Sequence, residues 1–81
     1  MPGDQSLVEL RIPVLDRPGE IAEVTTIAAR LGVNIVDFEI AHSLEGQRGT
    51  FVFVVPAAPD VDAFEAALLD DGYHVGRTTL S

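Results

Sequence analysis

The hydrophobic pattern of this chain changes its period at Pro18-Gly19, and this change constrains the fold more than any other feature. From Leu7 to Leu15 apolar and polar residues alternate, which predicts a strand with one buried face. From Pro18 to Leu31 apolar residues recur at helical spacing, which predicts an amphipathic helix, and Gly32 predicts its end. A strand followed at once by an amphipathic helix indicates a sheet packed against helices.

The segment after this helix predicts a β-hairpin. Alternation resumes from Val33 to Leu44, and Thr50 to Val55 is a β-branched and aromatic run suited to an inner strand. The polar residues 45–49 predict the connecting turn. The first strand of the hairpin carries Val36, Phe38 and Ile40 on one face and Asp37, Glu39 and Ala41 on the other.

A second helix and a last strand complete the predicted order. Asp60 is a favoured helix N-cap, and the apolar residues after it keep helical spacing up to Asp71-Gly72. The Val, Thr and Tyr content of residues 73–80 predicts the last strand. With right-handed crossovers, the order βαββαβ predicts an α+β, ferredoxin-like fold. Its four-stranded antiparallel sheet has the strand order 4-1-3-2, with both helices on one face.

In this strand order the first strand of the hairpin lies at an edge of the sheet, where it invites pairing with a second copy. With 81 residues the chain fits one domain, 1–81, in which residues 1–5 are expected to be a disordered tail. A core of this size gains stability from self-association. We therefore predict a homodimer whose edge contacts are Ile35, Asp37, Glu39 and Ala41.

Composition excludes several classes of function. Thirteen acidic residues against five arginines, with no lysine, give a net charge of −8, which disfavours nucleic acid and anionic membranes as partners. The absence of cysteine excludes disulfides and thiol chemistry, and neither His42 nor His74 has a partner at metal-ligand spacing. We expect no metal and no cofactor. Without a membrane-spanning run or a signal peptide, a cytoplasmic location is expected.

The turn between the first strand and the first helix has the make-up of a small-molecule site. Pro18 suits a first helical turn, and Gly19 lets a ligand approach the backbone closely. Backbone N–H groups at a helix start favour an anion, because they lack acceptors within the helix. Asp16 acts as a helix cap, as a partner for a ligand ammonium group, or as both. Arg17 is either a solvated turn residue or a carboxylate clamp.

Two segments together resemble the ACT domain, a small amino-acid-sensing module. They are Leu15–Ala22, which contains an Asp-x-Pro-Gly turn, and Leu31–Ile35, which contains Gly-Val-Asn-Ile. Both occur at the family spacing, and the likeness covers nearly the whole chain. The closer likeness is to the C-terminal ACT domains of prephenate dehydrogenases, where the following strand ends near a His-Ser pair, here His42-Ser43.

The resemblance implies a regulatory dimer that binds an amino acid between two protomers. The ligand would lie against the strand-to-helix turn of one protomer and the edge strand of the other. The implied ligand-binding residues are Asp16, Arg17, Pro18, Gly19, Glu20, Ile21 and Asn34. Asn34 has an alternative role in bonding the local backbone. The resemblance further suggests an aromatic amino acid as ligand, an enzyme of amino-acid metabolism as regulated partner, and no catalytic residue.

A ligand-independent dimerisation or protein-interaction module is the main alternative. Val14 stands where some serine-sensing ACT domains have a polar residue, and the Glu-Ser-Arg-Pro motif of phenylalanine-sensing relatives is replaced around residues 42–44. Val52, Val54 and Ala41 would give such a module an apolar patch on the sheet face opposite the helices.

An acylphosphatase-like hydrolase is the other alternative, because that class shares the βαββαβ order. Arg17 and Asn34 stand where that chemistry needs an arginine and an asparagine. However, Asp16 and Glu20 would repel a phosphate, and Pro18 removes one backbone amide from the loop. The sequence therefore favours a binding domain over an enzyme.

Overall fold

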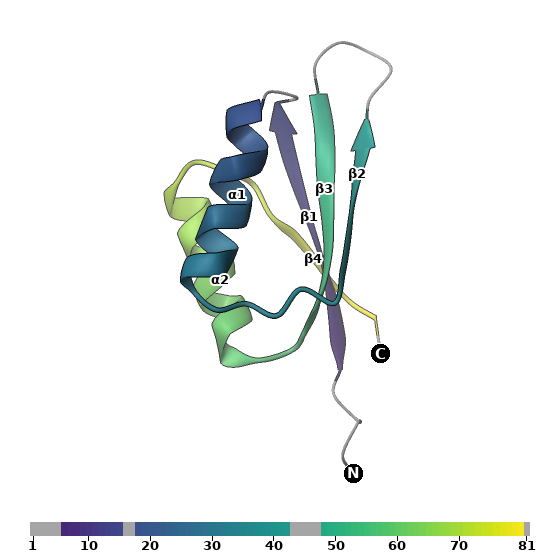
Figure 1. The fold of residues 1–81 in the computed structure, drawn as a ribbon. Helices are drawn as coiled ribbons and strands as arrows, with labels where there is room; N and C mark the ends of the chain where they lie inside the picture. Colours follow the sequence, from purple (N-terminus) through teal and green to yellow (C-terminus); the bar gives the residue numbers. More distant parts are fainter. Residues whose placement is uncertain (1–5, 16–17, 43–47, 81) are drawn as a thin grey trace.

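The computed structural model describes residues 6–15, 18–42 and 48–80, which form one sheet and one layer of helices (Figure 1). The elements in chain order are β1 (Leu7–Leu15), α1 (Pro18–Arg30), β2 (Asp37–His42), β3 (Arg48–Pro56), α2 (Pro59–Asp70) and β4 (Gly76–Thr79). This is the predicted βαββαβ order. Residues 1–5, predicted as a tail, and most of the predicted turn at residues 45–49 lie outside the described residues.

The four strands form one antiparallel sheet in the order β2-β3-β1-β4, which confirms the prediction. Leu10 of β1 and Phe38 of β2 both lie opposite Phe53 of β3, so β3 joins the two strands in register. β3 begins before the predicted Thr50, and β4 occupies only the last part of the segment predicted as a strand. Both helices lie on the same face of the sheet and run in opposite directions (Figure 1).

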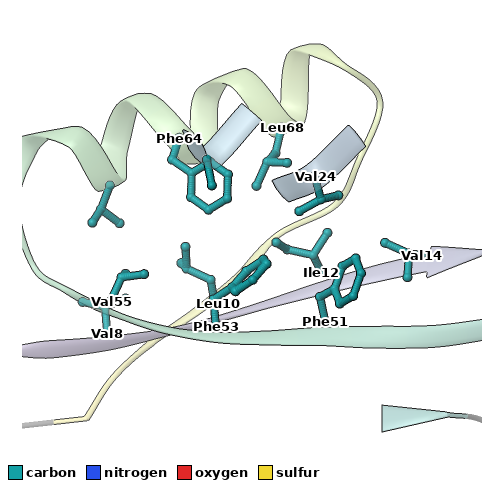
Figure 2. Packing of buried hydrophobic residues seen from close by; sticks show 12 residues of the cluster. Val8, Leu10, Ile12, Val14, Val24, Phe51, Phe53, Val55, Phe64 and Leu68 are labelled. Atoms are coloured by element: carbon teal, nitrogen blue, oxygen red, sulfur yellow. The ribbon is translucent and has the colours of Figure 1, made fainter. Parts of the chain in front are cut away.

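The hydrophobic core lies between the sheet and the helices, and its members follow the predicted periods (Figure 2). The buried residues are Val8, Leu10, Ile12 and Val14 from β1, Phe51, Phe53 and Val55 from β3, Val24 and Ala28 from α1, and Val61, Phe64 and Leu68 from α2. The ring of Phe53 lies 5.7 Å from that of Phe51 and 6.0 Å from that of Phe64, measured between centroids. Aromatic pairs at this separation stabilise a core beyond the area they bury.

Both helices end in the same way, through a glycine in the left-handed conformation. Gly32 has φ +69, and the next N–H, of Val33, donates to the carbonyl of Ala28 at 3.0 Å. Gly72 has φ +95, and the N–H of Tyr73 donates to a carbonyl of α2 in the same pattern. This closure satisfies carbonyl groups that a helix end leaves without partners. The predicted role of Gly32 is confirmed.

The predicted N-cap at Asp60 is wrong. α2 begins at Pro59, and its N-cap residue is Ala58, whose side chain makes no capping hydrogen bond. Proline suits the first helical position because the N–H that it lacks would have no partner there. The helix therefore starts two residues earlier than an N-cap at Asp60 would place it. Asp60 lies in the first turn, where its charge interacts favourably with the helix dipole.

The strand predicted from Val33 is shorter than expected, because β2 begins only at Asp37. Continuing the β2–β3 register would place Ile35 opposite Pro56, which has no N–H to donate to a strand ladder. Val33 and Ile35 instead pack, partly buried, against the core. Ile35, predicted as an edge contact, is therefore not part of the edge strand.

The helices leave the apolar face of β2 uncovered. Phe38 lies opposite Phe53, so it faces the helix side of the sheet, and the two ring centroids are 5.9 Å apart. Even so, Phe38 is 51% exposed and Val36 is 54% exposed, while Ile40 is half-buried. We call Val36, Phe38 and Ile40 the edge strip. The strip is a partly exposed apolar surface at the edge of the sheet.

Candidate functional site

The end of β1 and the start of α1, where the ligand site is predicted, meet at one end of the sheet (Figure 1). Because α1 begins at Pro18, the amides of Gly19 and Glu20 belong to its first turn and have no acceptor within the helix. The side chain of Ile21 packs against the core, which leaves only its backbone available to a ligand. Asp16 and Arg17 lie outside the described residues.

A cleft of about 450 Å³ lies at this end of the molecule. It is lined by Pro13, Val14 and Leu15 of β1, Glu20 and Glu23 of α1, Arg48 of β3, and Asp71, Gly72, Tyr73 and His74 after α2. We call it the β1–α1 cleft. Its volume lies within the range of small-molecule sites, roughly 300–1,000 Å³. An apolar wall, three carboxylates and one guanidinium together provide groups for an ammonium, a carboxylate and an apolar side chain.

Tyr73 closes one side of the cleft and is held there by the C-terminal turn of α2. Its backbone N–H donates to the carbonyl of Leu68 at 2.9 Å, and its hydroxyl lies 3.5 Å from Glu20 Oε2, at the long limit for a hydrogen bond. Burial, and then the negative charges of Glu20, Glu23 and Asp71, raises the pKa of the Tyr73 phenol above its usual 10.0. The phenol is therefore neutral in the cleft at neutral pH.

This environment of Tyr73 predicts a loss of stability in alkaline solution. Because the folded-state pKa lies above the unfolded value of 10.0, its contribution is complete below pH 10 and is lost as pH rises through the folded pKa. The chain has no lysine or cysteine and only one tyrosine, so no other side chain titrates just above pH 10. We expect a phenolate absorbance midpoint above 10, and Tyr73→Phe to remove the decline in unfolding free energy. A midpoint at or below 10 would contradict the placement of Tyr73 beside Glu20.

Asn34, the remaining predicted ligand contact, lies at the other end of α1. It lines a separate cavity of about 220 Å³ together with Val33, Pro56 and the start of α2. α1 has 13 residues, which at 1.5 Å per residue separates its two ends by about 20 Å. The structure therefore does not bring Asn34 and Gly19 together within one protomer.

Several residues of the β1–α1 cleft were not predicted from the sequence. Tyr73 and Glu20 are 53 positions apart, and no local pattern connects them. The one sequence signal for the position of Tyr73 was Gly72, because this glycine ends α2 and so fixes where the following residues leave the helix. His74, for which the sequence offered no partner, lines the same cleft.

The three other residues predicted as dimer contacts lie on the edge strand. Asp37, Glu39 and Ala41 are opposite Val54, Val52 and Thr50 of β3, on the sheet face away from the helices, and all three are exposed. They lie on the strand face opposite the edge strip.

Within residues 6–15, 18–42 and 48–80, no three His, Asp or Glu side chains are grouped so as to hold a metal ion. Among the described helices, none is long and apolar enough to cross a membrane.

Comparison with known proteins adds independent evidence on the fold. The family model of the ACT domain matches residues 8–72. The ACT domain of prephenate dehydrogenase from Bacillus anthracis is 29% identical, with a TM-score of 0.73 over 84% of this chain and 99% of that one. No curated protein sequence matches this chain significantly.

Two further solved structures share the fold at lower identity. An uncharacterised protein from Thermotoga maritima is 18% identical with a TM-score of 0.75, covering 96% of this chain and all (100%) of that one. The regulatory subunit of aspartate kinase from Thermus flavus is 20% identical with a TM-score of 0.69, covering 91% of this chain and 52% of that one. At these identities the two likenesses show the fold alone.

Proposed function

This chain belongs to the ACT domain family, and from that premise we propose that it binds an amino acid as a homodimer and regulates an enzyme of amino-acid metabolism. The observation that carries the proposal is the position of the α1 N-terminus at a cleft of suitable size and mixed polarity. The family match extends over both elements that form this end of the molecule.

The groups around the β1–α1 cleft suit a zwitterion. Glu20 lines the cleft, and its first-turn amide, with the helix dipole behind it, favours the α-carboxylate. Gly19 precedes Glu20 in the same turn, and Arg48 adds a positive charge at the cleft wall. The carboxylate of Glu20 is available to an ammonium group. Val14 and Leu15 offer apolar surface to the side chain of the ligand.

A two-fold dimer through β2 would complete this site with Asn34. In a two-fold interface the two β2 edges pair antiparallel, so opposite ends of the two protomers lie next to each other. The N-terminus of α1 in one protomer is then close to the C-terminus of α1 in the other. Asn34 follows that end of the helix. The separation of Asn34 from Gly19 within one protomer is therefore compatible with a site shared between two. The edge strip supports the same interface, because its exposed apolar side chains would be covered there.

Thermal unfolding of the purified chain with each proteinogenic amino acid in turn tests the proposal. A ligand at about 100 times its Kd adds about 2.7 kcal/mol to the unfolding free energy. In a domain of this size such a gain raises Tm by about 10 °C or more. We expect one chemical class of amino acid to produce this shift.

Gly19→Ala separates binding from folding. A Cβ at Gly19 would meet nothing within 4 Å, and its φ is not positive, so the variant should be at least as stable as the parent. A methyl group there obstructs the approach to the first-turn amides, and we expect affinity for the stabilising amino acid to fall about tenfold or more. Gly76→Ala, the same change in β4 and away from the cleft, should leave affinity unchanged.

Two outcomes would contradict the proposal. If no amino acid raises Tm while the dimer is intact, the chain is a ligand-independent interaction module. If the chain hydrolyses an acyl phosphate, the hydrolase alternative stands. The roughly 20 Å length of α1 argues against that enzyme, because it places Asn34 far from the first-turn amides of the same protomer.

A further inference from the structure

A second concave surface lies between the two helices, next to the β1–α1 cleft, with which it shares Glu23 and Asp71. It is a groove of about 260 Å³ lined by Glu23, Thr26, Ile27 and Arg30 of α1, by Leu31 directly after α1, by Ala67 and Asp70 of α2, and by Asp71 directly after α2. We call it the interhelical groove. The lining residues from Glu23 to Leu31 recur every three to four positions and extend over about 12 Å, or two helical turns.

The floor of the groove is apolar and lies beside the core without being covered by it. Ile27 and Ala67 are half-buried, and Leu31 is 37% exposed at one end. The core side chains of the same helices, such as Val24 and Leu68, face the sheet (Figure 2). The groove therefore presents apolar surface that the fold itself does not cover.

The rim of the groove carries three carboxylates, those of Glu23, Asp70 and Asp71, against one guanidinium, that of Arg30, so its net charge is negative. α1 and α2 contain the acidic residues Glu20, Glu23, Asp60, Asp62, Glu65 and Asp70, against a single arginine, Arg30. Arg77 of β4 neutralises charge elsewhere, at Asp62 (2.7 Å) and Glu65 (3.4 Å). Among the described residues, no cation forms an ion pair with Asp70 at the groove.

From this complementarity we propose that the interhelical groove docks a basic amphipathic helical segment of a partner protein. Apolar side chains on one face of such a segment would occupy the floor formed by Ile27, Leu31 and Ala67. Its Arg or Lys side chains would pair with the carboxylates on the rim, chiefly Asp70. Recognition of an amphipathic helix by an apolar groove with a charged rim is a recurrent mode of peptide binding. The groove would connect the domain to the protein that it regulates.

A designed peptide tests the proposal by calorimetric titration of the whole chain. The peptide is a helix with leucines at i, i+4 and i+7 on one face and arginines beside them. Two comparison peptides keep its length: one with the order scrambled, and one with glutamate in place of arginine. We expect saturable binding of the first peptide only, weakened as salt rises. Equal binding of the scrambled peptide would overturn the proposal, because a diffuse acidic surface would then suffice.

Matched variants locate the binding. Asp70→Asn should weaken the peptide about two- to fivefold, as expected for one exposed ion pair. Asp62→Asn removes the same charge from the same helix outside the groove and should change nothing. Leu31→Ser should weaken binding about tenfold, whereas Leu69→Ser, at an exposed position outside the groove, should not. Equal effects of the paired variants would overturn the proposal. So would loss of self-association in Leu31→Ser without peptide, because a second copy would then occupy the groove.

Discussion

Phe64→Ala is expected to reduce the unfolding free energy by about 3–5 kcal/mol, the usual cost of truncating a buried phenylalanine. Phe64 is fully buried in α2, and its ring is one of those packed on Phe53 at the centre of the core (Figure 2). A domain of this length has about 4–12 kcal/mol of stability in total, at roughly 0.05–0.15 kcal/mol per residue. The variant should therefore lose about a quarter or more of its stability, and at the lower end of that stability range it should be unfolded at room temperature. Urea unfolding followed by circular dichroism measures the loss.

Leu69→Ala in the same helix is the control for this prediction. Leu69 is 52% exposed, so its truncation removes little buried surface and should cost less than about 1 kcal/mol. Both changes place alanine, a good helix former, in α2, so they differ mainly in the burial that they remove. Similar losses at the two positions would show that α2 does not pack on the sheet through Phe64.

Phe38→Asp is expected to convert the proposed dimer to monomer at micromolar concentration. In that dimer the apolar ring of Phe38 is covered, and the variant both removes this burial and places a charge without a partner at the interface. A combined cost of about 3 kcal/mol or more raises the dimer Kd by a factor of about 100. Sedimentation at about 0.15 M salt measures the change, at an ionic strength that screens repulsion between the acidic protomers.

Leu69→Asp is the matched control for Phe38→Asp. The two parent side chains are nearly equally exposed, at 51% and 52%, and both variants add one negative charge. Leu69 lies in α2, and Phe38 lies on the β2 edge. Because only Phe38 belongs to the edge strip, Leu69→Asp should leave the dimer Kd unchanged. A dimer that survives Phe38→Asp, or dissociates equally in Leu69→Asp, would place the interface elsewhere.

The element types and the strand order were predictable because they depend on local periods and on one rule of handedness. Alternation over Leu7–Leu15 and helical spacing from Pro18 identify the first strand and helix, and right-handed crossovers then leave one position for each strand. Boundaries were less predictable. The apolar residues at 33, 35 and 36 look the same in the sequence whether or not they pair with a neighbour. In the structure β2 begins at Asp37, and the continued register would set Ile35 opposite Pro56, which has no N–H to donate.

The candidate site was predictable only on the side that is continuous in sequence. Gly19 and Glu20 are next to the end of β1, so the turn chemistry alone placed first-turn amides there. Tyr73 and Arg48 come from distant parts of the chain, and the fold places them at the β1–α1 cleft. Asn34 was grouped with Gly19 through a family resemblance, yet α1 holds the two apart within one protomer.

By itself, the sequence of this protein determined the type and order of the strands and helices, the order of the strands across the sheet, and which faces of β1, β3 and the helices fill the core. These properties follow from periodicity along the chain, which the sequence carries directly. Only the tertiary structure decided that Tyr73 lies beside Glu20 and that Phe38 is left uncovered at the sheet edge. Both depend on where the helices and their closing turns lie over the sheet, and that position results from the packing of the whole core.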